Sequence, residues 1–490
     1  MENYQNENLV KSKNFSEEYC CSIVRVGELQ DVENSDNLKK ATINGESIVV
    51  NKNDVKEGDV MLYVSNECQI DDTFLYENNL YADWQENANA EEIEKLIAAN
   101  PDYEKSEEMK TKRGYFGKNG RVRMIRLRGC PSFGVLFKPE ALVNAYGNWL
   151  LHIDWEAMVG TDFDAVICCP DVHSIPKVFV KAYVPPTRGG NHRTPSQKMS
   201  KWDKFDRMVD GQFKLHYDTE LLKKHLDLFK PTTPIAVTIK LHGTSFICGN
   251  LLVNYPKSMF RLRRLVNKVF KTSIPEFNQE YGMVVSSRKV IKNEWANNKH
   301  PEGFYGQDIW TEYGKILYPY IPNGFTIYGE ICGYLTGESK MIQKDYDYGC
   351  KVGENFLMIY RVTEHTETGL KEYNVGDIIV FTHYLTRAME KAQDKNVGRI
   401  MNIGDIMLFE GSVGFLTSDV EELPRVLSER FGIEENEPLC TQKVPREGVV
   451  VRIKDDEVAE AFKLKGVKFL EKEKSNIDKG EVDIEMQNNL

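Results

Sequence analysis

The sequence lacks any long apolar run. No stretch of its 490 residues approaches the roughly 20 consecutive apolar residues that a membrane-spanning helix needs. The first residues, MENYQNENLVKSK, also lack the apolar core of a signal peptide. With 41% hydrophobic and 28% charged residues, the chain is long enough for two or three domains with cores of their own. We therefore expect a soluble cytoplasmic protein, a monomer, with no membrane partner.

Metal-binding spacings of cysteine and histidine are missing as well. The ten cysteines include two adjacent pairs, Cys20/Cys21 and Cys168/Cys169, and otherwise stand singly without any CxxC spacing. The nine histidines show no HExxH motif. Neither a disulfide framework nor a zinc site has this pattern, so we expect buried free thiols.

An excess of positive charge is also missing, because 63 Lys and Arg face 74 Asp and Glu for a net charge of −11. A polyanion such as nucleic acid would have to bind a local basic surface, since the overall field repels it. The average charge therefore neither supports nor excludes a nucleic-acid partner.

Short strand patterns separated by polar turns occupy residues 1–180, including YCCSIVRV, GDVMLYVSN and FGVLFKP. Such a series predicts a small β-barrel module, which the resemblance described below implies to be OB-like. An acidic, largely helical pattern near 82–110 reads as an insertion in it. Residues 181–204 are basic and rich in Pro and Gly, which is typical of a linker.

Strand and helix patterns mix in residues 205–475, and 476–490 have the composition of a tail. Helical patterns occur at TELLKKHLDLF (219–229), RLRRLVNKVF (261–270) and SDVEELPRVLSERF (418–431). The fold class that we predict is α+β, with the barrel module followed by a domain of antiparallel sheets and flanking helices.

Lys240 ends the alternating apolar stretch IAVTIK and opens the segment KLHGTS. A lysine three residues before a glycine arises about twice by chance in a chain of this length. Here, however, it begins an ordered series of six segments: KLHGTS (240–245), SSRK (286–289), FTIYGEI (325–331), FLMIYRV (356–362), EGVVVRI (447–453) and FKLKG (462–466).

This series resembles the nucleotidyltransferase motifs of the ATP-dependent ligases and capping enzymes, and most of all those of RNA ligases with an OB-type module before the catalytic domain. The resemblance implies an ATP-dependent RNA ligase. Such an enzyme joins a 3′-hydroxyl to a 5′-phosphate RNA end through a lysyl-AMP intermediate and an adenylylated 5′ end. It implies Lys240 as the nucleophile and Mg²⁺ or Mn²⁺ as cofactor; a virus-encoded RNA repair enzyme fits this chemistry.

The chemistry of the residues agrees with the resemblance. An amine with a pKa of about 10.4 is protonated near neutral pH and cannot attack phosphorus, but nearby cations favour its neutral form. Along a strand FKLKG, Lys463 and Lys465 share one face while Phe462 and Leu464 share the other. The resemblance implies that the two lysines contact the α-phosphate; an isolated KxK would more often be an exposed strand.

The resemblance also implies roles for other residues. Glu447 would bind the divalent metal, for which carboxylate oxygen is a suitable ligand. Arg288 and Glu330 would reach the ribose hydroxyls, with Lys289 near phosphate. Either Tyr360 or Phe356 would stack on adenine, although aromatic residues in strands more often belong to the core.

Two positions near the lysine leave alternatives open. His216, in FKLHYDT, would contact adenine by resemblance, but Asp218 or Thr219 could equally cap a helix that starts there. At position 242 many members of the family have Asp, whereas this chain has His242, which carries no fixed negative charge near neutral pH. We read that change as a mark of subtype.

Two basic segments are candidates for RNA binding. Residues 257–271 contain Arg261, Arg263 and Arg264, and residues 121–129 contain Arg126 and Arg128. Cations interleaved with stacking groups suit a phosphate backbone and unpaired bases, although each segment alone could be a solvated face. The alternatives for the whole chain are an mRNA capping guanylyltransferase, a DNA ligase, and a non-catalytic protein that binds RNA ends.

Overall fold

The structure, a computed structural model, describes residues 8–168, 176–185, 206–215, 219–288, 290–292, 305–454 and 460–479. His216, Lys289 and most of the predicted linker lie outside these ranges. The chain divides into two units, Met1–Val184 and Pro185–Leu490. In the described ranges, no helix is long and apolar enough to cross a membrane.

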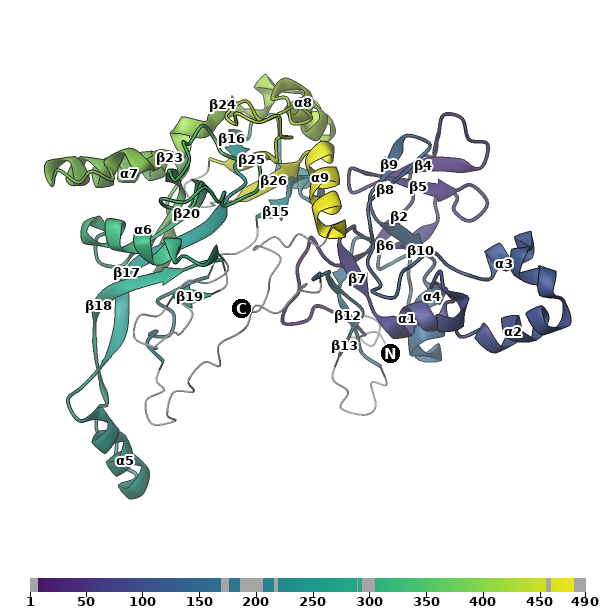
Figure 1. Cartoon of the computed structure of the whole chain (residues 1–490), viewed down its shortest axis with the longest axis horizontal. Coiled ribbons are helices and arrows are strands. Elements are labelled where there is room, and N and C mark those ends of the chain that lie inside the picture. Colours follow the sequence, from purple (N-terminus) through teal and green to yellow (C-terminus); the bar gives the residue numbers. More distant parts are fainter. Residues whose placement is uncertain are drawn as a thin grey trace. The chain divides into compact units, whose positions relative to one another are not determined.

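Small antiparallel sheets make up the first unit (Figure 1). The central sheet has the order β10-β6-β2-β11, formed by Val135–Phe137, Val60–Val64, Cys21–Arg25 and Asp162–Phe163. A second sheet has the order β3-β4-β5, formed by Gln30–Asp31, Leu38–Ile43 and Glu46–Asn51. Neither sheet closes on itself through the strands described here, so the structure establishes a mixed α+β unit, and the OB-like β-barrel stays a prediction.

The acidic segment of the first unit contains helices α2 (Ala90–Ala99) and α3 (Glu107–Thr111). They pack around a small cluster of their own, Ile93, Tyr103 and Met109. Ser106 accepts a hydrogen bond from the Met109 N–H and so caps α3. Helices α1 (Asp72–Glu77) and α4 (Glu140–Tyr146) pack on the main core instead.

The described strands of the second unit form two sheets. The first has the order β15-β26-β25-β16-β24, formed by Glu220–Leu221, Ala461–Lys465, Gly448–Ile453, Pro234–Lys240 and Met407–Ser412. The other has the order β19-β18-β17-β20-β21-β22, formed by Ile291–Lys292, Phe277–Ser286, Thr244–Pro256, Phe325–Gly333, Asn355–Thr366 and Gly369–Glu372. A short strand, β23 (Ile400–Asn402), runs parallel to β21.

Alternating apolar residues explain how these sheets are covered. Val237, Val449 and Phe462, from three neighbouring strands, share a core with Leu423 and Leu427 of helix α8 (Leu423–Arg430). The other sheet is covered by helices α6 (Ile309–Leu317) and α7 (Val375–Lys391), whose buried faces join its apolar residues in the largest core. In both cores, every second residue of a strand packs against residues from one face of a helix.

One predicted helix is wrong. Residues 219–229 form strand β15 and two 3-10 turns, Leu222–Lys224 and Leu226–Leu228. Strand β15 pairs in parallel with β26, and Leu222 is buried in the core of that sheet. Pairing with a strand distant in sequence thus overrides the local helical pattern. The other two predicted helices are present as α5 (Phe260–Phe270) and α8.

Candidate active site

Lys240 is the last residue of β16, and β17 begins at Thr244. The two strands belong to different sheets, so the turn 241–243 carries the chain from one sheet to the other. At Gly243 a Cβ atom would lie 2.3 Å from the Ile331 carbonyl oxygen and 2.7 Å from Cys332 Sγ. Only glycine fits this crossing without a backbone shift, which is a physical reason for the spacing between Lys240 and Gly243.

The three lysines that the sequence singled out lie on one face of the five-stranded sheet. Lys240 pairs with Gly448, and Gly448 pairs with Lys465 on the next strand. In the row two residues further along, Val450 pairs with Lys463. Paired residues of antiparallel strands point to the same face, and so do residues two apart. The alternation predicted for FKLKG is confirmed, because Phe462 and Leu464 lie in the core on the other face.

Glu447 directly precedes β25 and contacts Lys240 on the lysine face. Its Oε1 lies 2.6 Å from Nζ of Lys240, and the glutamate side chain is only 4% exposed. Burial raises the pKa of Glu447, but the charge of Lys240 and the proximity of His242 outweigh this and hold the pKa well below its usual range. The carboxylate is therefore ionised at neutral pH.

The second oxygen of Glu447 is a suitable ligand for a metal ion. Oε2 is buried, lies 3.5 Å from Nδ1 of His242, and makes no hydrogen bond to the residues that the structure describes. An ionised, buried oxygen without a donor fits a hard divalent cation such as Mg²⁺ or Mn²⁺. Glu447 thus meets the requirement for the metal ligand that the resemblance implied.

The backbone on both sides of Glu447 is held in place. Before it, Arg446 forms a buried ion pair with Glu437 at 3.0 Å. After it, Gly448 adopts φ +152°, and a Cβ atom there would lie 2.0 Å from the Leu464 carbonyl oxygen. The Gly466 N–H donates to the Glu447 carbonyl at 2.9 Å. These contacts bring β26, and with it the two lysines, close to Glu447.

His242 lies in an aromatic cage. Its ring meets Tyr346 and Phe469 edge-on, with centroids 4.9 and 5.0 Å away. Its backbone N–H donates to the hydroxyl of Tyr348 at 2.7 Å. An aspartate here would place a second carboxylate among apolar rings and next to Glu447, which explains why this chain tolerates, and suits, an imidazole.

The loop that supplies two rings of this cage was not predicted from the sequence. The two tyrosines belong to the segment DYDYG (345–349), and Phe469 comes from α9 (Val467–Asp478). Asp347 accepts hydrogen bonds from the Thr441 N–H at 2.9 Å, from the Thr441 hydroxyl, and from the Gly349 N–H at 3.1 Å. Burial raises the pKa of Asp347, but these donors more than compensate and lower it. A dense run of tyrosines and acids between two strands was the available signal.

Glu330 and Arg288 lie at the same end of the second sheet. Oε1 of Glu330 accepts a hydrogen bond from the Gly243 N–H at 3.1 Å, and Glu330 pairs with Ser245 across the strands. Arg288 follows Ser286, whose partner is Ile247 on the Ser245 strand. Glu330 therefore contacts the turn 241–243 directly, and Arg288 stands one strand away.

The two candidate adenine platforms occupy different places. Phe356 packs edge-to-face against Tyr348, with centroids 6.4 Å apart. Tyr360 lies at the bulge of β21 opposite Tyr328 and Gly329, and Cζ of Arg452 is 5.9 Å from its ring centroid. The adenine contact of either ring remains a prediction.

Arg452 is a further cation that the sequence analysis did not single out. It pairs with Ala461 and Ala236, so it shares the face of Lys463 and Lys465. Burial lowers its pKa. The signal was the alternation of EGVVVRI, in which positions 448, 450 and 452 share one face.

Helix α9 borders the lysine face on its far side. Nζ of Lys465 lies 3.7 Å from Oε2 of Glu473 and 5.6 Å from the ring centroid of Phe469. Lys472, one residue earlier, contacts Asp345 at 3.1 Å. The helix after FKLKG thus supplies both an aromatic wall and an acidic partner to the site.

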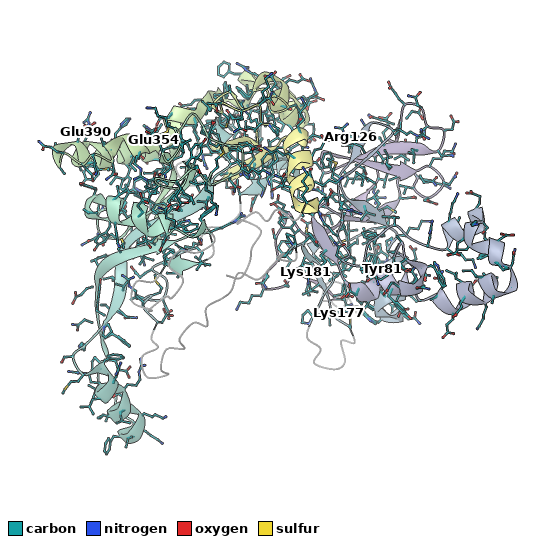
Figure 2. The ribbon with its side chains drawn as sticks, in the orientation of Figure 1. Tyr81, Arg126, Lys177, Lys181, Glu354 and Glu390 are labelled. Atoms are coloured by element: carbon teal, nitrogen blue, oxygen red, sulfur yellow. The ribbon has the colours of Figure 1, made fainter. Side chains whose placement is uncertain are left out.

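The two basic segments differ in how their cations are used. In the first unit Arg126 (Figure 2) and Arg128 are exposed, whereas Arg121 is buried in an ion pair with Glu67 at 2.7 Å. In the second unit Arg264 pairs with Glu276 at 2.9 Å, and Arg263 donates to the Ser258 carbonyl at 3.1 Å. Part of each basic segment therefore stabilises its own unit.

No protein-family model matches the sequence, and no curated protein matches it. The chain is similar to solved structures of Naegleria gruberi RNA ligase. A mutant with ATP and Mn is 15% identical, with a TM-score of 0.49 over 92% of this chain and 98% of that chain. A mutant with AMP and Mn is 14% identical, with a TM-score of 0.49 over the same shares. The ligase with PPi is 15% identical, with a TM-score of 0.47 over 93% and 98%. Identities and TM-scores this low carry no argument about function, so the proposed function is based on the geometry of the site.

Proposed function

We propose that this protein is an ATP-dependent RNA ligase that forms phosphodiester bonds between 3′-hydroxyl and 5′-phosphate RNA ends. The observation that carries the proposal is the row Lys240, Gly448 and Lys465 beside the buried, ionised Glu447. A binding protein has no need of a lysine at the mouth of a cation-lined, carboxylate-containing site. A nucleotidyl transfer enzyme needs this set.

In the first step the neutral amine of Lys240 attacks the α-phosphorus of ATP. A nitrogen–phosphorus bond forms, the bond from the α-phosphorus to the bridging oxygen breaks, and pyrophosphate leaves. The ammonium must lose its proton to solvent beforehand. The ionised Glu447 favours the proton on Nζ, whereas Lys463 and Lys465 oppose it and compensate the charge on the phosphate.

Glu447 orients the nucleophile through its 2.6 Å contact with Nζ. A divalent cation held by its second oxygen would neutralise phosphate charge during the transfer. Glu330 holds the turn through the Gly243 N–H, so that Lys240 stays at the strand end. His242, held by its cage, lies near Oε2 of Glu447, while Lys240 contacts Oε1, so the carboxylate stands between the two side chains.

In the later steps a terminal 5′-phosphate oxygen of RNA attacks the phosphorus of lysyl-AMP and releases the lysine. A 3′-hydroxyl then attacks the 5′-phosphate, the new phosphodiester forms, and AMP leaves. Glu330 and Arg288 are proposed for the ribose hydroxyls, Lys289 for phosphate, and Tyr360 or Phe356 with His216 for adenine. We further propose an OB-type RNA-binding role for the first unit, with Arg126 and Arg128 among its contacts.

The test is labelling of the full chain with α-labelled ATP or GTP and Mg²⁺ or Mn²⁺. We expect ATP to label the wild type and Lys240→Ala to remain unlabelled. Lys454→Ala is the matched control, because Lys454 follows β25 in the same sheet and pairs with Glu410 instead. Label from GTP alone would identify a guanylyltransferase, and no label from either nucleotide would leave the RNA-end-binding protein.

Ligation itself is tested with a 5′-phosphorylated RNA and its DNA counterpart. We expect the wild type to join RNA ends and to release AMP in equal amount. Preferential joining of DNA ends would replace the RNA ligase by a DNA ligase.

A further inference from the structure

Helix α5 forms the tip of the long hairpin β17–β18 and stands away from the rest of the second unit (Figure 1). None of its residues is buried. Its apolar residues nevertheless recur with the spacing of an amphipathic helix, whose apolar face normally packs against another surface. The nucleotidyl transfer site, at the opposite end of β17, makes no use of it.

One sector of α5 anchors the helix to the hairpin. Arg264 pairs with Glu276 at 2.9 Å and lies over the Phe260 ring. Arg263 donates to the Ser258 carbonyl, and the Asn267 side-chain amide donates to the Ile274 carbonyl at 2.8 Å. The orientation of the helix is therefore set, and so is the direction of its other sectors.

A second sector is apolar and faces solvent. Leu262, Leu265 and Val269 follow the i, i+3, i+7 spacing, and Phe270 extends the stripe. Together with Met259 they are between 44% and 72% exposed. Leaving so much apolar surface in water costs about 25 cal/mol for each Å². A contiguous apolar stripe of this kind marks an interaction surface.

A third sector, beside the stripe, is basic. Arg261 and Lys268 flank the apolar residues along the helix, and Lys271 follows its end; all three are exposed. Residues 257–275 contain no acidic side chain at all. The tip therefore carries a local positive charge on a chain whose net charge is −11.

We propose that α5 docks the protein on an anionic lipid surface. A lipid headgroup layer accepts both sectors, because the apolar stripe enters the acyl boundary while the flanking cations meet the negative headgroups. RNA would cover the cations and could stack on Phe270, but it would leave Leu262, Leu265 and Val269 in water, since aliphatic side chains neither stack on bases nor accept hydrogen bonds. With 11 residues the helix is too short to span a bilayer of about 20 residues, so it lies in the interface.

This surface changes two expectations drawn from the sequence. The composition predicted no membrane partner, and the basic residues of 257–271 predicted RNA contact. Sequence alone does not show that Leu265, Val269 and Phe270 stay exposed, and their exposure is what favours lipid. The inference is independent of the chemistry at Lys240.

The test is sedimentation of the full chain with vesicles of phosphatidylcholine alone or of equal parts phosphatidylcholine and phosphatidylserine. We expect binding to the anionic vesicles only. The triple variant Leu265→Gln, Val269→Gln, Phe270→Gln loses roughly tenfold or more of that binding, because most of its apolar stripe becomes polar. Lys268→Glu with Lys271→Glu loses it as well, and high salt weakens wild-type binding.

The matched control is Val380→Gln with Tyr384→Gln, two exposed apolar residues of α7 that the proposal does not use. It keeps full vesicle binding, and all variants keep the wild-type circular dichroism and Lys240 labelling. Failure of the wild type to bind anionic vesicles overturns the proposal. So does loss of single-stranded RNA binding in the triple variant with vesicle binding unchanged, which assigns α5 to RNA.

Discussion

The two faces of the five-stranded sheet in the second unit have opposite characters. On one face Phe462, Leu464 and their neighbours form a core without a charge. On the other face the same strand presents Lys463 and Lys465, of which Lys465 lies in the row of Lys240. Burial of the first face stabilises the fold, whereas grouping cations on the second costs stability unless an anion compensates them. The contrast separates the residues that stabilise the fold from those that we propose for the chemistry.

Glu447→Gln should have the largest effect, and only on the lysine face. The amide keeps the shape of the side chain but removes the charge beside Lys240 and the ionised ligand for a cation. We expect labelling with ATP to fall about a thousandfold. Measurement of single-turnover labelling at saturating Mg²⁺ checks this, with Glu429→Gln as the control, since Glu429 lies on α8 and pairs with Arg425 instead. A loss of less than tenfold would contradict the role of Glu447.

Phe462→Ala tests the apolar face. Removing this fully buried ring should lower the free energy of unfolding by about 3–5 kcal/mol. Labelling per folded molecule should stay within a few-fold of the wild type, because the side chain points away from the lysines. Urea unfolding followed by circular dichroism measures the first quantity. An unchanged stability together with lost labelling would reverse our assignment of the two faces.

Lys463→Met is the counterpart on the same strand. Methionine fills a similar volume without the buried charge, so stability should stay equal or rise by about 1 kcal/mol. Labelling should fall about a hundredfold, since one cation facing the α-phosphate is lost. The pair of variants, Phe462→Ala and Lys463→Met, thus predicts opposite changes in stability and in activity. If stability and labelling declined together in both variants, the two faces would not be separable.

His242→Asp tests the aromatic cage. A carboxylate there lies next to Glu447 and between the rings of Tyr346 and Phe469, so labelling should fall roughly tenfold. Labelling of His242→Asn, whose side chain is neutral, should fall less. Full activity of His242→Asp would show that histidine and aspartate are interchangeable at this position.

The smallest effect concerns acid stability. The folded-state pKa of Glu447 lies below its ordinary value of about 4.3, so its ionised form contributes stability that is fully present above that pH. The contribution is lost as the pH falls from there towards the folded-state value. Between about pH 6 and pH 3 the wild type should therefore lose more stability than Glu447→Gln. Equal losses in urea unfolding would contradict the direction of the shift.

Much of the site was accessible from the sequence because strands alternate. The FKLKG pattern alone predicts which two residues join the core and which two face the site, and the register confirms it. The series of short segments also located Glu447 and Glu330, both of which contact the turn at Lys240 or Gly243. The arrangement of the sheets in the first unit was less accessible, since short strand patterns say nothing about whether the strands close into a barrel.

Residues that act through packing escaped prediction. Tyr346, Tyr348 and Phe469 surround His242 from two segments far apart in the chain. The helix predicted at 219–229 failed for the same reason, because its pairing with β26 is not a local property. Arg452 lay inside a recognised segment, yet its place on the lysine face depends on the register of three strands.

The sequence by itself determined the class of chemistry, since a lysine, a carboxylate and a KxK strand in fixed order are local patterns of residue type and period. Only the tertiary structure decided that Lys240 meets Glu447 at 2.6 Å, that His242 stands in an aromatic cage, and that the apolar stripe of α5 stays in water. The physical reason is that alternation is set by backbone geometry within one strand, whereas distance and exposure depend on which distant segments pack together.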